Sequence, residues 1–234
     1  MRKEKPWGYI PEPTVRASLV NGIQVFADDA VPLLVLGFVV IVVGGVCRSI
    51  LLFVDYGPYY TAALYLAIAG PLELGMSFVC LRAVRSGRVN IEHLIAISGR
   101  YWQLVLANGL MFMIFPGLFA ILVVPGLAFY CATRFVPFLL LEDELTGASA
   151  IRESIRLSRS CFWQLLGVCA VGSLATVLGT VSILGLVPAL IWWNLSLASL
   201  YHAKVRPPAG WALEDAEDIE MMQSQQLEDQ EQEQ

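Results

Sequence analysis

Residues 31–53, VPLLVLGFVVIVVGGVCRSILLF, decide the fold class of this chain. Arg48 is the one charged side chain in the stretch. A helix needs about 20 predominantly apolar residues to cross the roughly 30 Å hydrocarbon core of a bilayer, and the core of a water-soluble domain of this size does not require such a run. The stretch therefore predicts a transmembrane helix.

The same character extends along most of the chain. Its 234 residues are 57% hydrophobic and 15% charged, against about 45–50% and about 25% in soluble domains. Residues 59–84 predict a second span. Residues 101–141 are too long for one span, and Phe115-Pro116-Gly117 with Val124-Pro125-Gly126 predict a hairpin of two helices there. Two further spans start at Phe162 and after a turn at 182–185. We therefore expect an all-α, polytopic transmembrane helical bundle of about six spans.

Three shorter segments have the amphipathic pattern of helices that lie in the membrane interface. In residues 14–29 the apolar positions are Val15, Leu19, Ile23 and Phe26. Residues 91–98 follow Asn90, a favourable N-cap. In residues 147–161 one face carries Ala148, Ile151 and Ile155, and another carries Arg152, Arg156 and Arg159.

Basic residues fix the expected orientation, because Lys and Arg concentrate in cytoplasmic loops. Six spans put fourteen of the fifteen on one side and leave Arg48 on the other. The sequence thus predicts a cytoplasmic basic arm (1–13), a six-helix transmembrane domain (14–205) and an acidic, Gln-rich, disordered cytoplasmic tail (206–234).

An aromatic-Trp-Gln-Leu motif occurs twice, as Tyr101-Trp102-Gln103-Leu104 and as Phe162-Trp163-Gln164-Leu165. Tyr101, Trp102, Phe162 and Trp163 are expected to be interfacial anchors. Each motif follows an amphipathic segment and opens an apolar hairpin, which predicts three repeated units. The alternative is that aromatic residues recur at span starts by interfacial chemistry alone.

Several short motifs resemble a bacterial six-helix membrane-protein family. They are Gly70-Pro71-Leu72-Glu73-Leu74-Gly75, then Val124-Pro125-Gly126-Leu127, and Ala150-Ile151-Arg152-Glu153-Ser154 followed by Phe162-Trp163. The family comprises YciC-type proteins and the membrane domain attached to some glycerophosphoryl diester phosphodiesterases. The resemblance, over roughly residues 15–203, implies a multi-pass protein of the bacterial cytoplasmic (inner) membrane with both termini cytoplasmic. The activity of the family is largely unestablished, and the 234 residues contain no phosphodiesterase domain from which an activity could be carried over.

Glu73 and Arg134 are the main candidates for a site, because an ionisable residue inside a span is costly and often functional. They could bind an anion or relay protons; equally, they could form a structural ion pair or snorkel to the interface. Arg152, Arg156 and Arg159 are candidates for lipid headgroups, against generic attraction to anionic lipid. Asn108 and Asn194 are expected to form interhelical hydrogen bonds.

Enzyme and metal motifs are missing from the sequence. It contains neither HExxH, GxSxG, a Walker A loop nor a CxxC pair, and it has two histidines. The five cysteines, at positions 47, 80, 131, 161 and 169, suit small apolar packing residues. We expect no catalysis, metal, cofactor or nucleic acid, but membrane lipids and protein partners or a second copy. The predicted function is a membrane-organising or lipid-interacting component; the alternative is a transporter or channel for a lipid-like or small anionic solute.

Overall fold

The computed structural model describes residues 12–53, 65–86, 101–121, 123–142 and 145–205. Every regular element in these ranges is a helix, which confirms the all-α class. The chain divides into two compact units, Met1–Lys204 and Val205–Gln234. Most of the predicted basic arm, the predicted helix at 91–98 and the predicted tail from 206 lie outside the described residues.

Eleven helical elements follow one another within the described ranges. They are α1 (Val15–Asp28), α2 (Ala30–Phe53), the π-helical turn η1 (Tyr65–Ala69), α4 (Gly70–Ser86), α6 (Tyr101–Ile121), α7 (Val123–Ala132), the 3-10 turn η3 (Thr133–Phe135), α8 (Val136–Glu142), α9 (Gly147–Arg159), α10 (Phe162–Val181) and α11 (Ile183–Lys204).

Three stretches are long and apolar enough to cross a membrane, namely Ala30–Cys47, Tyr65–Arg85 and Phe162–Val181. Two shorter apolar stretches, Tyr101–Ile114 and Pro125–Leu141, accompany them among the described residues. The chain is thus a membrane protein by the length and composition of its helices. Three candidate spans are fewer than the six predicted, so neither the six-span count nor the three repeated units is confirmed.

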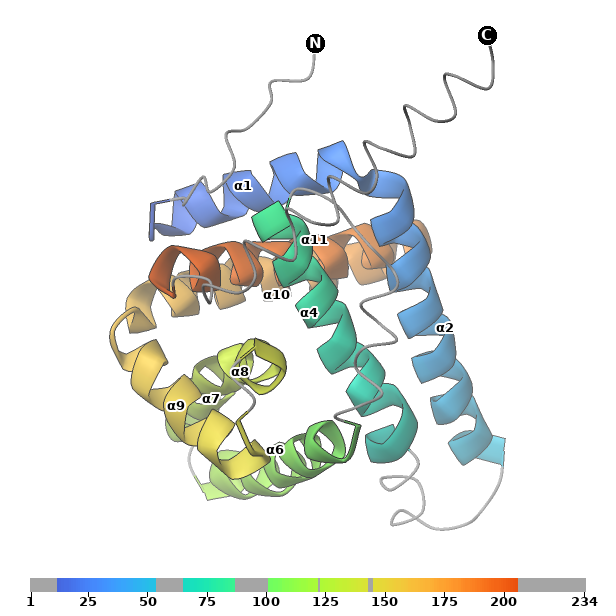
Figure 1. Ribbon diagram of the computed structural model, residues 1–234. Helices are drawn as coiled ribbons and strands as arrows, with labels where there is room; N and C mark the ends of the chain where they lie inside the picture. Colours follow the sequence, from blue (N-terminus) through green and yellow to red (C-terminus); the bar gives the residue numbers. More distant parts are fainter. Residues whose placement is uncertain (1–11, 54–64, 87–100, 122, 143–144, 206–234) are drawn as a thin grey trace, which may run out of the picture. The chain divides into compact units, whose positions relative to one another are not determined.

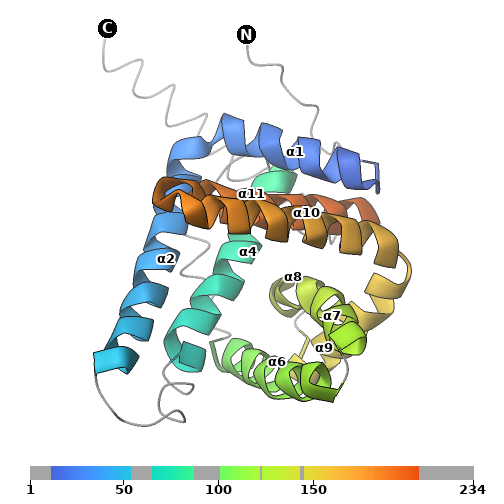
Figure 2. The ribbon, with the colours of Figure 1, turned by 180° about the vertical axis from the view of Figure 1, so that it is seen from behind.

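A turn joins α10 to α11, and in it the amide of Gly185 donates to the Ser182 carbonyl. The two helices pack side by side. Helix α1 lies along α11, and α2 and α4 run across this layer rather than along it (Figures 1 and 2). Helix α4 is almost entirely buried, with Val79, Cys80 and Leu81 fully inaccessible. It therefore forms the centre of the helical unit, against α11.

Helix α1 packs against the helical unit through a face other than the apolar one, which the sequence assigns to the membrane interface. It buries Ser18, Asn21, Gly22 and Val25, and the Asn21 amide donates to Ser199 Oγ over 2.8 Å. Ile23, assigned to the apolar face, is 54% exposed. The physical reason is that lipid solvates apolar side chains as well as protein does, so helix contacts in membranes favour small and polar residues.

The chain also turns at a different place from the predicted break at 115–117. Helix α6 continues through that Pro-Gly pair to Ile121, and α7 starts at Val123 with Pro125 in its first turn. A proline is tolerated in a first turn, where its missing N–H has no intrahelical partner. A proline inside a membrane helix is tolerated when other groups satisfy the freed carbonyl.

Candidate functional site

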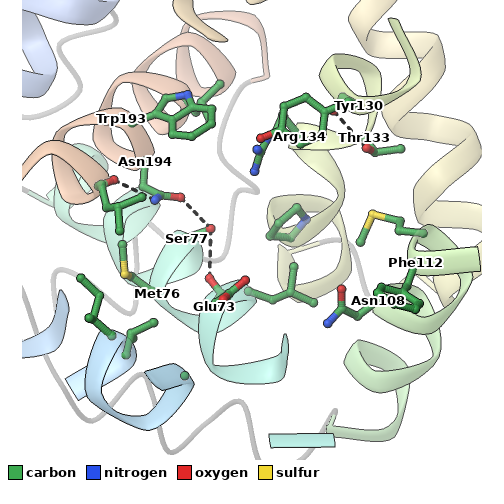
Figure 3. Close-up of a pocket in the computed structure, with 18 of the residues that line it drawn as sticks. Glu73, Met76, Ser77, Asn108, Phe112, Tyr130, Thr133, Arg134, Trp193 and Asn194 are labelled. Atoms are coloured by element: carbon green, nitrogen blue, oxygen red, sulfur yellow. Dashed lines mark hydrogen bonds between the residues drawn. The ribbon is translucent and has the colours of Figure 1, made fainter. Parts of the chain in front are cut away.

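A cavity of about 870 Å³ lies among α2, α4, α6, α7, α8 and α11. Most of its walls are apolar, and its polar lining includes Tyr65, Glu73, Ser77, Asn108, Thr133, Arg134 and Asn194. Figure 3 shows Glu73 and Arg134 reaching it from different elements, α4 and η3. The structure thus brings the two predicted ionisable residues to one cavity.

Arg134 is held between two aromatic rings. Its Cζ lies 4.0 Å from the centroid of Tyr130 and 4.6 Å from that of Trp193. A cation over an aromatic face is stabilised by roughly 0.5–2 kcal/mol, more when both groups are desolvated. The Nε of Arg134 is buried and has no hydrogen-bond partner among the described residues. The rings therefore stabilise the charge while leaving hydrogen-bond donors of the guanidinium unused.

Arg134 sits where a helix changes pitch. The Val136 amide donates to the Thr133 carbonyl in η3, one residue closer than in an α-helix. This leaves the Ala132 carbonyl without its usual amide partner. The hydroxyls of Ser154 and Ser158, one turn apart on α9, both donate to that carbonyl. Two serines of the interfacial helix thus support the turn that carries Arg134.

Glu73 lies in the first turn of α4, just after the π-helical turn η1 passes into this helix. Its side chain is exposed, and the Tyr65 hydroxyl donates to Oε1 over 2.8 Å. Ser77 Oγ lies 2.9 Å from Asn194 Oδ1 and 3.2 Å from the Glu73 carbonyl oxygen. This contact realises the interhelical role predicted for Asn194. It also ties the start of α4 to α11.

Asn108 reaches the same region because Gly70 has no side chain. A Cβ on Gly70 would lie 1.7 Å from Asn108 Nδ2. The close approach of α6 to the start of α4 therefore depends on this glycine. Asn108 and Glu73 both line the cavity.

Glu73 and Arg134 do not form a direct ion pair. Both side chains are described, and no contact within 4.0 Å joins the guanidinium to the carboxylate. Each is instead held by its own neighbours, Glu73 by Tyr65 and Arg134 by Tyr130 and Trp193. No direct contact therefore supports the alternative that these two residues form a structural ion pair.

The three arginines of α9 lie apart from the cavity and are exposed. Arg156 forms an ion pair of 3.2 Å with Glu153. The buried face of α9 comprises Ala150, Ile151, Ser154 and Ser158, whereas Ala148 of the predicted face is exposed. The two serines pack toward the helical unit because their hydroxyls donate to the Ala132 carbonyl.

The two aromatic motifs have matching geometry. The rings of Tyr101 and Trp102 are 5.6 Å apart at 76°, and those of Phe162 and Trp163 are 5.7 Å apart at 73°. Trp102 and Trp163 are 74% and 78% exposed. Each motif opens its helix, α6 or α10. Two indoles at helix starts, facing away from the protein, are placed as interfacial anchors would be.

Sequence reasoning missed the aromatic walls of the site. Tyr130 lies four residues before Arg134, one helical turn away, so this pairing could have been read from spacing. Trp193 could not, because it comes from α11. Its ring rests on Gly172, where a Cβ would lie 2.2 Å from Cδ1.

The described residues contain no group of three or more His, Cys, Asp or Glu side chains placed to hold a metal ion. All five cysteines are free and buried. Comparisons with protein-family models, curated proteins and solved structures found no match to this chain.

Proposed function

We propose that this chain is a non-enzymatic membrane protein that binds a lipid bearing a phosphate in its headgroup. The phosphate lies at Arg134, and the acyl chains follow the apolar walls of the cavity. The observation that carries this proposal is the buried, unpartnered Nε of Arg134 at the edge of an 870 Å³ cavity.

The chemistry of arginine favours this ligand. A guanidinium offers five N–H donors in a planar fork that matches phosphate oxygens. The aromatic rings of Tyr130 and Trp193 lie against the guanidinium and satisfy none of those donors. Cavities of about 300–1,000 Å³ suit small-molecule ligands. An amphiphile with a phosphate at one end satisfies both the donors and the apolar walls.

The exposed arginines of α9 extend the proposal to the membrane surface. Each basic residue near an anionic leaflet contributes about 1 kcal/mol of attraction. Arg152 and Arg159 supplement Arg156 on a helix whose other face is bound to the helical unit. We therefore assign the protein an organising role through lipid contacts, with a protein partner or a second copy as further contacts.

We place the chain in a bacterial inner membrane, with six spans and both termini cytoplasmic. The distribution of arginines and the resemblance to the six-helix family support this topology. Helix lengths support it too, since the 21 residues of α6 and the 22 of α11 extend about 31 and 33 Å at 1.5 Å per residue.

Native mass spectrometry in nanodiscs tests the proposal by recording the lipids retained and the number of subunits. Arg134→Gln should lose the tightly held lipid, and Arg134→Lys, which keeps the charge without the fork, should retain less than the wild type. Arg16→Gln, an exposed arginine on α1, is the matched control. Equal retention by wild type and Arg134→Gln, with both folded, contradicts the proposal.

Transport is the second candidate, favoured by the non-α turns η1 and η3 beside the cavity. Interrupted helices that carry charged groups are typical of transporter binding sites. Liposome flux of a small anion or a labelled lipid tests it. Glu73→Gln and Arg134→Ala should abolish flux while expression is unchanged, and flux indistinguishable from that of protein-free liposomes excludes transport of the solute used.

A further inference from the structure

Charges of both signs line the cavity without a direct ion pair between them. Arg134 lies between the rings of Tyr130 and Trp193, and Glu73 comes from another element of the cavity wall (Figure 3). The Tyr65 hydroxyl donates to the Glu73 carboxylate. Neither contact cancels a charge, because a tyrosine ring and a tyrosine hydroxyl are neutral. Arg134, whose Nε is buried, carries its charge at a desolvation cost that a bound anion would reduce, and the exposed carboxylate of Glu73 is accessible to a cationic group of the same ligand.

A ligand with a single negative charge would satisfy only Arg134. It would leave the Glu73 carboxylate facing the ligand with like charge, which costs more in a low-dielectric site than in water. A ligand with a single positive charge would likewise face Arg134 with a charge of the same sign. Only a ligand with both signs compensates both groups.

We infer that the cavity recognises a zwitterionic amphiphile that carries a phosphate and a primary ammonium group; the inference rests on the proposed lipid-binding function. The phosphate accepts hydrogen bonds from the guanidinium of Arg134. The ammonium donates to the carboxylate of Glu73, whose position the Tyr65 hydroxyl fixes. Tyr65 is thus a positioning residue.

The remaining walls suit the hydrocarbon part of such a molecule. Val40 and Ile41 of α2 and Met111 of α6 line the cavity with apolar atoms. Gly44 and Gly45 complete the α2 wall, and a Cβ on either would meet nothing within 4 Å. Their small size leaves room for acyl chains to pass between the helices.

Competition between two lipids tests the inference. The full chain is reconstituted in nanodiscs with equal amounts of phosphatidylethanolamine and phosphatidylglycerol of identical acyl chains, and the retained lipids are counted by native mass spectrometry. Wild type should retain phosphatidylethanolamine preferentially. Glu73→Gln should lower that preference about tenfold, as expected for loss of a charge-assisted hydrogen bond. Tyr65→Phe should lower it less.

Two controls separate this inference from the proposed function. Glu12→Gln, an exposed glutamate before α1 and outside the cavity, should leave the preference unchanged. Arg134→Gln should reduce retention of both lipids. Equal retention of the two lipids by wild type, or a preference unchanged by Glu73→Gln, overturns the zwitterionic assignment while lipid binding at Arg134 stands. Retention that Arg134→Gln does not alter removes the lipid-binding function and this inference together.

Discussion

At the scale of single residues, the position of Trp193 depends on an atom that Gly172 lacks. The indole occupies the space where a side chain on Gly172 would begin. Trp193 in turn forms one wall against Arg134. One glycine on α10 therefore controls the environment of a charged group carried by η3.

Gly172→Ala should weaken lipid retention and shift tryptophan fluorescence. The added methyl overlaps the indole, and overpacking of this kind costs about 1–3 kcal/mol. The free energy of unfolding in an SDS titration and the retained lipid both report the change. Gly109→Ala on α6, where a Cβ meets nothing within 4 Å, is the control and should be neutral or slightly stabilising. Equal behaviour of the two variants would contradict the role of Gly172.

Cys161, between α9 and α10, should make the protein less stable as the pH rises into the alkaline range. Burial raises the pKa of its thiol above the ordinary value of 9.0, although Lys204 and Ser160 oppose the shift. The folded state therefore binds the proton more tightly than the unfolded state, and this stabilisation is present below pH 9.0 and lost as the pH rises through the folded pKa. Thermal midpoints between pH 8 and 10 measure the effect. Cys161→Ala should show a smaller decline than wild type, and identical slopes would refute it.

At the scale of elements, α9 and the α7–α8 segment are joined through one carbonyl group. Ser154 and Ser158 both donate to the Ala132 oxygen. One donor is enough to satisfy this carbonyl oxygen. Either serine can therefore compensate for the loss of the other.

The double variant Ser154→Ala/Ser158→Ala should therefore lose more stability than the two single variants combined. Leaving a buried carbonyl unsatisfied costs about 1–3 kcal/mol, whereas each single variant keeps one donor. A double-mutant cycle on the free energy of unfolding gives the coupling. Ser149→Ala, on the same helix but bonded only within its own turn, should be nearly silent. Additive losses would show that the hydroxyls act separately.

How much of these helices the sequence predicts depends on whether each helix face contacts water, lipid or protein. Apolar spacing located α1, α9 and the long apolar helices, because helix periodicity is local. It did not identify the faces of α1 and α9 that pack against the protein, because hydrophobicity does not separate a lipid-facing side chain from a packed one. Glu73 and Arg134 stood out as charges among apolar residues. Their shared cavity depends on contacts between distant segments, which spacing does not encode.

At the scale of the whole molecule, the number of membrane crossings decides on which side the C-terminus lies. Six spans predict that Thr146 and Gln234 face the same side as the N-terminus and that Ser182 faces the other. Three spans, at α2, η1–α4 and α10, would put Gln234 on the side of Ser182. Helix α4 crosses the α10–α11 layer at a steep angle instead of running parallel to it (Figure 1), whereas the arginine distribution favours six spans.

Thr146→Cys, Ser182→Cys and Gln234→Cys should label from opposite sides as six spans require. A membrane-impermeant maleimide is added to sealed vesicles of known orientation, and the parent protein with its five buried cysteines gives the background. We expect Thr146→Cys and Gln234→Cys to react from the cytoplasmic side and Ser182→Cys from the other. Labelling of Ser182→Cys and Gln234→Cys from one side would rule out six spans.

The 3-10 turn at Thr133–Phe135 determines how firmly Arg134 is held at the cavity. The segment's own backbone contributes to this turn, because Pro137 has no N–H to donate to the Thr133 carbonyl and an uninterrupted α-helix is disfavoured there. The serine hydroxyls of α9 occupy the carbonyl and hold the segment bent. Pro137 thus sets the turn from within the segment and the two serines of α9 hold it from outside, so that Arg134 is kept between its two rings by contacts from three separate helices, α7, α9 and α11.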